Sequence, residues 1–165
     1  MSAVPVWSLV ALSNTGKTTF LEKLIPALNA LGLTVGVVKH DAHDFEWDRE
    51  GKDTQRLSRA GAAVTAILSD TQFALREARP LSPEEAVARV TGVDLVLTEG
   101  YKRGPWPKLA LCRAGSPPAV PLARCAALVT DTPPGEGCPV PCFPIDDPVP
   151  LARWLAERCK EESMP

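Results

Sequence analysis

The sequence predicts an α/β fold in which helices flank a largely parallel sheet. Short apolar runs alternate with segments of helical periodicity along most of the chain, and the segment 6–38 holds a strand, a helix and a second strand in succession. This order implies a parallel pair, since two parallel strands need a crossover between them. The 165 residues, 45% of them hydrophobic, suffice for a sizeable core, so we expect a single domain over 1–165.

The first strand and helix have the clearest patterns. Residues 6–12 form a continuous apolar run, which is typical of a buried strand. A helix follows, because leucine and isoleucine recur at helical spacing until Gly32 ends the pattern, at positions 21, 24, 25, 28 and 31. Pro26 lacks a backbone donor and is expected to bend this helix. Residues 34–38 then predict a second strand.

The remaining elements are shorter. We expect helices over 53–60, 82–90 and 148–160, and strands over 64–68, 72–76, 95–98, 109–112, 126–129 and 142–144. Ser82 and Glu85 have the spacing of a capping box at the start of the second of these helices. The 17 prolines cluster after the first hundred residues and should stiffen surface connections there.

Charge and hydropathy exclude several classes of partner. The 18 Lys and Arg against 20 Asp and Glu give a formal charge of −2. The chain therefore lacks the excess of positive charge that attracts nucleic acid or an anionic membrane. No apolar run is long enough for a membrane-spanning helix, and the short N-terminal run lacks the preceding cation of a signal peptide. Five cysteines without a CxxC pair predict free thiols, and hence a cytoplasmic protein.

Residues 11–18, Ala-Leu-Ser-Asn-Thr-Gly-Lys-Thr, match the phosphate-binding P-loop, or Walker A motif, with Ala11 at the usual first glycine. The strand before it and the helix after it are the context that the motif requires. We expect backbone N–H groups along the loop to surround the β-phosphate, and the nucleotide-binding residues are Ser13, Asn14, Thr15, Gly16, Lys17, Thr18 and Thr19. Lys17 would stabilise the β- and γ-phosphates electrostatically, and the Thr18 hydroxyl would bind Mg²⁺. Ala11 fits only at negative φ.

Acidic residues at the ends of buried strands are the candidates for a second metal ligand. Glu99 follows the apolar run 95–98, and Asp41 follows the second predicted strand, so both should lie at the phosphate edge of the sheet. His40 and His43 flank Asp41, but without a further ligand nearby a polar loop is the better interpretation. Asp94, at the start of its strand, should lie at the opposite edge and be structural.

Base recognition would need a carboxylate near the end of a late strand. Asp131 follows the apolar run 126–129 and could accept hydrogen bonds from guanine N1–H and N2–H, which adenine does not offer. An Asp just before a proline turn is also a common turn residue, so both interpretations stay open.

Several blocks of sequence together resemble one family. They are Ser-Asn-Thr-Gly-Lys-Thr-Thr at 13–19, Val-Val-Lys-His-Asp-Ala-His-Asp-Phe-Glu at 37–46, Gly-Lys-Asp-Thr at 51–54, Ala-Gly-Ala at 60–62, and Asp-Leu-Val-Leu-Thr-Glu-Gly-Tyr-Lys at 94–102, with Pro107-Lys108 after them. The chain resembles the molybdopterin-guanine dinucleotide biosynthesis protein B (MobB) family from about residue 6 to residue 160.

The resemblance implies a P-loop NTPase fold and a homodimer that binds GTP and Mg²⁺ with weak GTPase activity. It also implies an adaptor that helps a partner guanylyltransferase to attach GMP to molybdopterin. The family's phosphate-site residues carry over onto Ser13 to Thr19, and its metal-side acidic position onto Glu99. Where this chain has Ala11, the family usually has glycine.

Two other functions, and the role of one loop, remain open. A P-loop small-molecule kinase would need an arginine-bearing lid, for which only Arg76, Arg79 and Arg103 are available; a metal-delivery GTPase would depend on His40 and His43. No Asp-x-x-Gly-Gln switch follows Glu99, so we expect slow GTP hydrolysis. The loop 101–107 is stiff and aromatic, and it is either a contact surface in a homodimer or guanylyltransferase complex, or it folds back over its own sheet.

Overall fold

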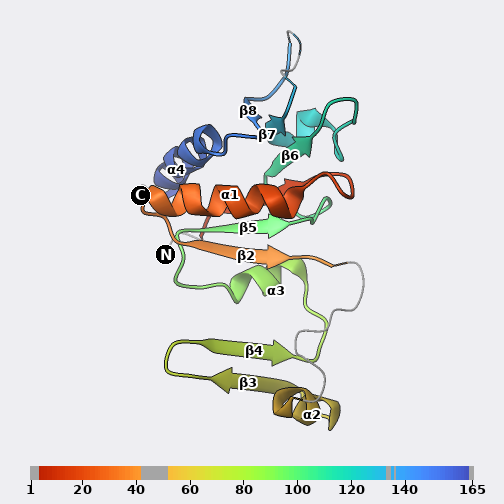
Figure 1. Cartoon of the computed structure of the whole chain (residues 1–165), viewed down its shortest axis with the longest axis vertical. Helices are drawn as coiled ribbons and strands as arrows, with labels where there is room; N and C mark the ends of the chain where they lie inside the picture. The colour runs from red at the N-terminus through yellow and green to blue at the C-terminus, as the bar shows by residue number, and fades with distance from the viewer. Residues whose placement is uncertain (1–3, 42–51, 133–134, 136, 164–165) are drawn as a thin grey trace. The chain divides into compact units, whose positions relative to one another are not determined.

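The computed structural model describes residues 4–41, 52–132, 135 and 137–163, which form two compact units (Figure 1). The larger unit comprises residues up to 40 and from 83 onward, and the smaller unit comprises residues 41–82. The strand, loop and helix of the P-loop all lie in the larger unit. One nucleotide-binding domain over the whole chain stays a prediction.

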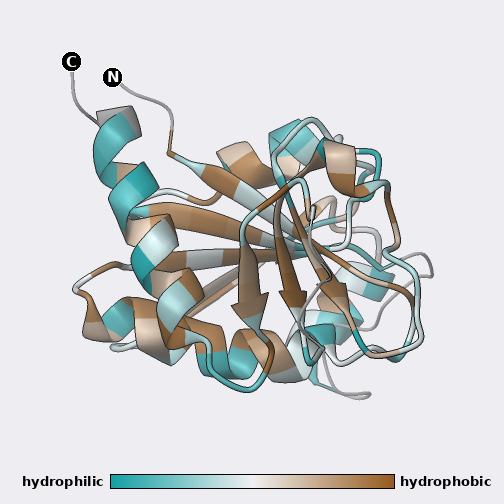
Figure 2. Ribbon diagram, turned by 90° about the horizontal axis from the view of Figure 1, so that it is seen from above, coloured by the Kyte–Doolittle hydropathy of each residue, from teal (hydrophilic) through white to brown (hydrophobic). Residues whose placement is uncertain are grey.

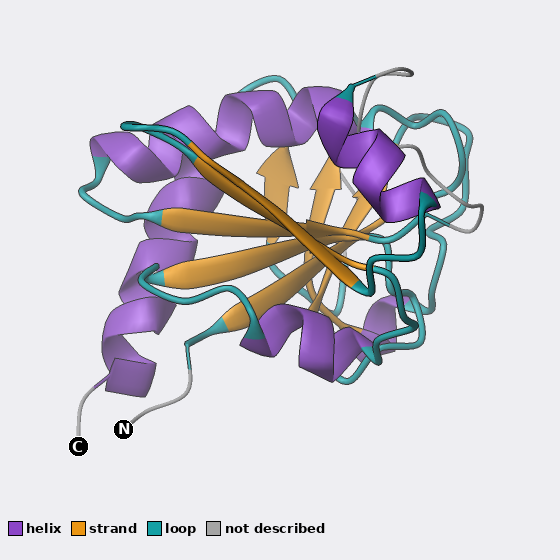
Figure 3. Ribbon diagram, turned by 90° about the horizontal axis from the view of Figure 1, so that it is seen from below, coloured by secondary structure: helices purple, strands orange, loops and turns teal. Residues whose placement is uncertain are grey.

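The larger unit is built on a six-stranded sheet with the strand order β2-β5-β1-β6-β7-β8, and every neighbouring pair is parallel. The strands are β1 (Val6–Val10), β2 (Val35–Lys39), β5 (Leu95–Glu99), β6 (Lys108–Cys112), β7 (Cys125–Thr130) and β8 (Cys142–Pro144). The helices are α1 (Lys17–Ala30), α3 (Pro83–Ala88), the 3₁₀ turn η1 (Leu122–Arg124) and α4 (Val149–Ser163). Figure 3 shows the helices packed along the twisted sheet. The predicted fold class is confirmed.

Alternation along the strands divides the core between the two faces of this sheet. On one face, leucines of β1, β5 and β6 pack against the apolar sides of α1 and α4; Leu9, Leu97 and Leu109 are fully buried. Burying one such side chain contributes about 1.5–3 kcal/mol. The opposite face carries a smaller cluster around Ala110 and Leu128. Figure 2 shows the resulting apolar strands at the centre of the fold.

The predicted elements are all present, with ends that differ by at most three residues. The first strand ends at Val10 instead of residue 12, because Ala11 and Leu12 already belong to the turn into the P-loop. The predicted helix 82–90 is shorter, ending at Ala88, and the last helix runs on to Ser163. The short turn η1 was not predicted.

The smaller unit is a helix and a hairpin. It holds α2 (Asp53–Arg59), β3 (Val64–Leu68) and β4 (Phe73–Glu77), and the two strands pair antiparallel with Leu68 opposite Phe73. Large apolar side chains of this unit lie 46–77% exposed: Leu57, Val64, Ile67, Leu68, Phe73 and Leu75. The exposed apolar side chains of β3 and β4 are called the apolar hairpin surface below.

Within the described part of the chain, none of the helices has the length and apolar character needed to cross a membrane.

Candidate nucleotide-binding site

The turn between β1 and α1 has the backbone of a phosphate-binding loop. Asn14 and Gly16 both have positive φ, at 60° and 97°. Asparagine and glycine are the residues that adopt this conformation at least cost, and it turns the N–H groups of the loop toward its inside. Ala11 is absent from the positive-φ residues and is 2% exposed. Its φ is therefore negative, as the sequence required for an alanine at this position, and its methyl group is buried in the core.

The first turn of α1 is open to an anion. Gly16 caps the helix without a side chain, and no acidic residue lies in the first turn. The first N–H groups of a helix have no partner inside it and carry the positive end of the helix dipole. The Thr15 hydroxyl donates to the Leu12 carbonyl at 2.8 Å and closes the loop, whereas Lys17 Nζ lies 3.4 Å from the same oxygen. Lys17 is thus only weakly held.

The two expected magnesium ligands are brought together across the sheet. The Thr18 hydroxyl donates to Glu99 Oε1 at 3.0 Å, although 81 residues separate them in sequence. Glu99 ends β5 beside Leu9 of β1, which places it at the edge where the P-loop begins. Its side chain is buried at 9% exposure, and within the described residues no lysine or arginine pairs with it. A buried carboxylate next to a hydroxyl, both hard oxygen ligands, fits Mg²⁺.

The end of β2 places His40 beside the end of β5. The His40 backbone N–H donates to the Glu99 carbonyl at 3.1 Å, and its ring stacks on Tyr101 with centroids 4.8 Å apart. Asp41 is exposed and is the first residue of the smaller unit, so its role as a metal ligand stays a prediction. His43 lies outside the described residues. Among the residues that are described, no three His, Cys, Asp or Glu side chains form a metal-binding group.

Arg113 is a residue of this site that the sequence analysis missed. It follows β6 directly, and its Nε donates to the Thr15 carbonyl of the P-loop at 3.1 Å. A Cβ on Gly16 would lie 3.5 Å from Arg113 Nη2. The guanidinium is half-exposed beside the loop, so it can add positive charge there. The signal was available, because Arg113 ends an apolar run at the same sheet edge as Glu99.

Asp131 lies at the end of β7, in contact with Arg113. Asp131 Oδ1 accepts from the Ala114 N–H at 2.7 Å and from the Thr132 hydroxyl at 3.2 Å, while Oδ2 lies 3.6 Å from Arg113 Nη1. The carboxylate is thus at the expected edge and already has protein partners, which a bound base would have to share. Guanine recognition by Asp131 stays a prediction.

Asp94 lies at the opposite edge, as expected. Its Oδ2 accepts from both the backbone N–H and the hydroxyl of Thr34, each at 2.6 Å, and joins the start of β5 to the start of β2. These hydrogen bonds to the Thr34 hydroxyl and backbone N–H lower the pKa of Asp94. The residue is structural.

The loop after Glu99 is ordered by contacts of its own aromatic residues, and its use as a contact surface stays a prediction. Gly100 and Tyr101 both have positive φ, at 101° and 53°. Trp106 packs edge-on against Tyr101, with ring centroids 5.8 Å apart, and the Pro107 carbonyl accepts from the Ser8 N–H. Burial raises the pKa of Tyr101, and the nearby Glu84 charge adds to the rise. The loop therefore connects the metal-side carboxylate to an ordered aromatic contact.

Comparison with known proteins identifies the family. The family model described as "Molybdopterin guanine dinucleotide synthesis protein B", MobB, matches residues 6–131, which span β1 to the residue after β7. The chain belongs to the MobB family. It is 40% identical over 119 residues to the molybdopterin-guanine dinucleotide biosynthesis adapter protein of Escherichia coli, covering 68% of each chain. It is 39% identical over 114 residues to that of Haemophilus influenzae, covering 67% of this chain and 64% of the relative.

Solved structures of the family agree with the fold. The crystal structure of Bacillus subtilis MobB superposes with a TM-score of 0.76 at 30% identity, over 93% of this chain and 97% of that one. A MobB homologue from Bacillus stearothermophilus gives 0.66 at 27% identity, over 94% and 98%. The fold is thus the P-loop NTPase fold of this family.

Proposed function

We propose that this protein is a GTP-binding adapter that acts with Mg²⁺ in the synthesis of molybdopterin guanine dinucleotide, with slow GTP hydrolysis. The observation that carries the proposal is the Thr18 to Glu99 contact at the open N-terminus of α1. It supplies two hard oxygen ligands beside an anion site, as a magnesium nucleotide requires. The family is named for this synthesis, and the relatives in E. coli and H. influenzae are named adapter proteins.

Each residue of the loop has a distinct part in this chemistry. The backbone N–H groups of 14–19 would bind the β-phosphate, and Lys17 would stabilise charge on the β- and γ-phosphates. Thr18 and Glu99 would hold the metal, which when bound neutralises phosphate charge. Arg113 would add a second cation and keep the Thr15 carbonyl turned away from the phosphates. Together these groups bind and orient a nucleoside triphosphate.

Hydrolysis is proposed to be slow because the chain offers little to activate water. The family of switch GTPases positions a glutamine over the attacking water, but Gly100 here leads into Tyr-Lys-Arg. Stabilising the phosphates without orienting water leaves most of the barrier in place. We therefore propose that the main role of the protein is to bind GTP. Its partner would be a guanylyltransferase that carries out the transfer of GMP.

A homodimer and a cytoplasmic location complete the proposal. The apolar hairpin surface of β3 and β4, with Leu68 77% and Phe73 65% exposed, is the support for self-association. The cytoplasmic location rests on the sequence, in which five cysteines without a CxxC pair predict free thiols.

A nucleotide titration of the full-length protein tests the proposal. Lys17→Ala should abolish tight binding of a fluorescent GTP analogue while circular dichroism stays unchanged, because Lys17 makes only one long contact in the fold. Lys23→Ala, at an exposed position on the same helix, is the matched control and should bind normally. Unchanged affinity in a folded Lys17→Ala variant would overturn the site. A wild-type hydrolysis rate near the enzyme median of about 10 s⁻¹ would overturn the adapter role.

A further inference from the structure

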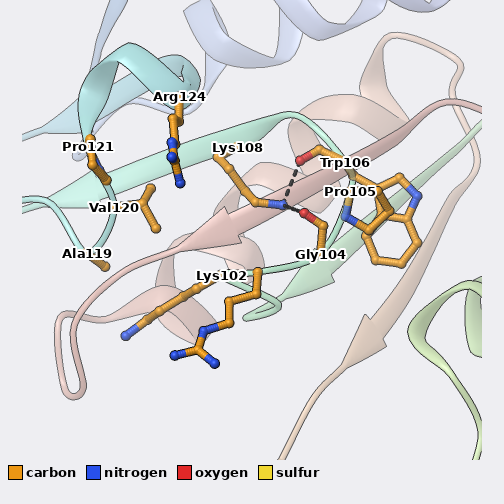
Figure 4. Close-up of a pocket in the computed structure, with 10 residues that line it drawn as sticks. Lys102, Gly104, Pro105, Trp106, Lys108, Ala119, Val120, Pro121 and Arg124 are labelled. Carbon is orange, nitrogen blue, oxygen red and sulfur yellow. Dashed lines mark hydrogen bonds between the residues drawn. The ribbon is translucent and has the colours of Figure 1, made fainter.

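A second pocket lies away from the P-loop, on the other face of the sheet. It has a volume of about 570 Å³, within the range of about 300–1,000 Å³ that is usual for small-molecule sites. Its walls are the loop after β5 and the segment that leads into β7, with Lys108 between them (Figure 4). Lys108 is the first residue of β6, and its neighbour Leu109 faces the α1 and α4 core, so Lys108 faces the opposite side.

The lining of this pocket is cationic. It contains Lys102, Arg103, Lys108 and Arg124 but no acidic side chain. Within the described residues, none of the four forms an ion pair. Figure 4 shows Arg124 extending into the pocket on the side of Val120 and Pro121, whereas the Lys108 ammonium points the other way, toward the Gly104 and Trp106 carbonyls. In a chain with a net charge of −2, four cations without a carboxylate among them form a local positive field.

Lys108 is the most unusual member of the group. It is 6% exposed, and its Nζ donates to the carbonyls of Gly104 at 2.8 Å and Trp106 at 2.6 Å. Two carbonyls leave one of the three ammonium donors for another acceptor. Burial lowers the pKa of Lys108, as expected for a cation removed from water without a carboxylate beside it. A bound anion would offset this desolvation and occupy the third donor.

The chemistry of the lining points to phosphate. Two arginines can each form paired hydrogen bonds to phosphate oxygens, and a lysine adds a point charge at the base of the pocket. Trp106 contributes an aromatic wall next to these cations. The P-loop uses the carboxyl ends of β1 and β5, whereas this pocket is built at the amino ends of β6 and β7, so one phosphate group cannot serve both sites.

We propose that this pocket binds the phosphate or diphosphate group of a second small organic ligand, separate from the nucleotide in the P-loop. The proposal goes beyond the GTP-binding role and does not depend on it. Residues 102–106 line this pocket, and the same loop starts directly after Glu99 of the P-loop site, so one loop joins the two sites.

The test is a calorimetric titration of the full-length Lys17→Ala protein, in which the P-loop is disabled. The probes are inorganic pyrophosphate and flavin mononucleotide, a phosphate ester that carries a planar ring. We expect both to bind, and Arg124→Gln to weaken each at least about tenfold, as for loss of a charged hydrogen bond. Arg153→Gln, exposed on α4, is the matched control and should bind like its parent. Tighter binding of the flavin would assign an organic phosphate, and equal binding would assign the phosphate group alone.

Lys108→Gln is the second variant, because Lys108 also ties down the loop. We expect Lys108→Gln to weaken pyrophosphate binding as well. Normal pyrophosphate binding by Arg124→Gln would overturn the proposal even if Lys108→Gln failed to fold. Absence of binding by folded Lys17→Ala protein at millimolar probe would overturn it as well. Failure of GTP binding by the wild type would leave these titrations unaffected, so the two proposals fail separately.

Discussion

Replacing Glu99 with glutamine should weaken magnesium-dependent nucleotide binding without weakening the fold. Glu99 is buried, receives the Thr18 hydroxyl at 3.0 Å, and has no cationic partner among the described residues. Glutamine keeps the shape and an oxygen that accepts the Thr18 hydrogen bond, so the variant removes the charge alone. The effects on binding and on stability should therefore have different signs.

The size of the binding effect follows from the charges. Two unit charges about 4 Å apart interact by about 1 kcal/mol in water and about 4 kcal/mol at an effective dielectric constant of 20. A divalent ion doubles these values, to about 2–8 kcal/mol. The phosphate edge opens to solvent, so we take the lower limit, which corresponds to an affinity loss of about 30-fold for the magnesium nucleotide. Removing a buried, uncompensated charge should leave the free energy of unfolding unchanged or higher.

Two measurements on the same preparations separate these effects. A fluorescent GTP analogue is titrated with and without Mg²⁺, and urea unfolding is followed without nucleotide. Glu157→Gln, exposed on α4, is the control for the loss of one carboxylate. Thr18→Val is the counterpart, because it leaves the Glu99 carboxylate without its hydroxyl donor and should destabilise the fold by about 1–3 kcal/mol. A Glu99→Gln variant with the wild-type magnesium response, or with a large loss of stability, would refute the reasoning.

Three further predictions follow from other contacts. Asp131→Asn should reduce the preference for GTP over ATP in competition titrations while phosphate affinity is retained; equal weakening of both would show that Asp131 does not recognise the base. Gly36→Ala should cost about 1–3 kcal/mol in urea unfolding, since its Cβ would collide with Val90 of the same unit, and wild-type stability would contradict the packing. Because the pKa of Asp94 is lowered in the fold, its carboxylate stabilises the fold at pH values above its ordinary pKa of 3.8, and this stabilisation is lost as the pH falls through the folded pKa. Asp94→Asn should therefore be less stable than wild type at neutral pH and equally stable in acid. A constant difference in stability across the acid range would contradict this.

The sequence predicted those parts of the molecule that depend on local pattern. The P-loop, the strand that ends at Glu99 and the structural place of Asp94 all follow from which end of a buried strand a polar residue occupies. The Thr18 to Glu99 contact was predictable because parallel strands bring their carboxyl ends to one edge. These conclusions depend on which end of a strand a residue occupies and hardly on the order of the strands in the sheet.

Other features depend on contacts between distant segments, which a local pattern does not specify. Arg113 contacts the carbonyl of Thr15 only because β6 pairs with β1, and sequence alone does not fix that neighbour. The cationic pocket combines residues from two loops around Lys108, each unremarkable by itself. Tyr101 of the loop 101–107 stacks on His40, and this contact with the end of a distant strand was not predictable from the composition of the loop.

A crystal structure of the protein with a non-hydrolysable GTP analogue and Mg²⁺ tests the central claim most directly. The account predicts the triphosphate at the N-terminus of α1, with Lys17 at its β- and γ-phosphates. The metal should lie on the Thr18 hydroxyl oxygen and the Glu99 carboxylate at about 2.0–2.1 Å, or reach the carboxylate through one water. A nucleotide bound elsewhere, or a metal that approaches neither Thr18 nor Glu99, would contradict it.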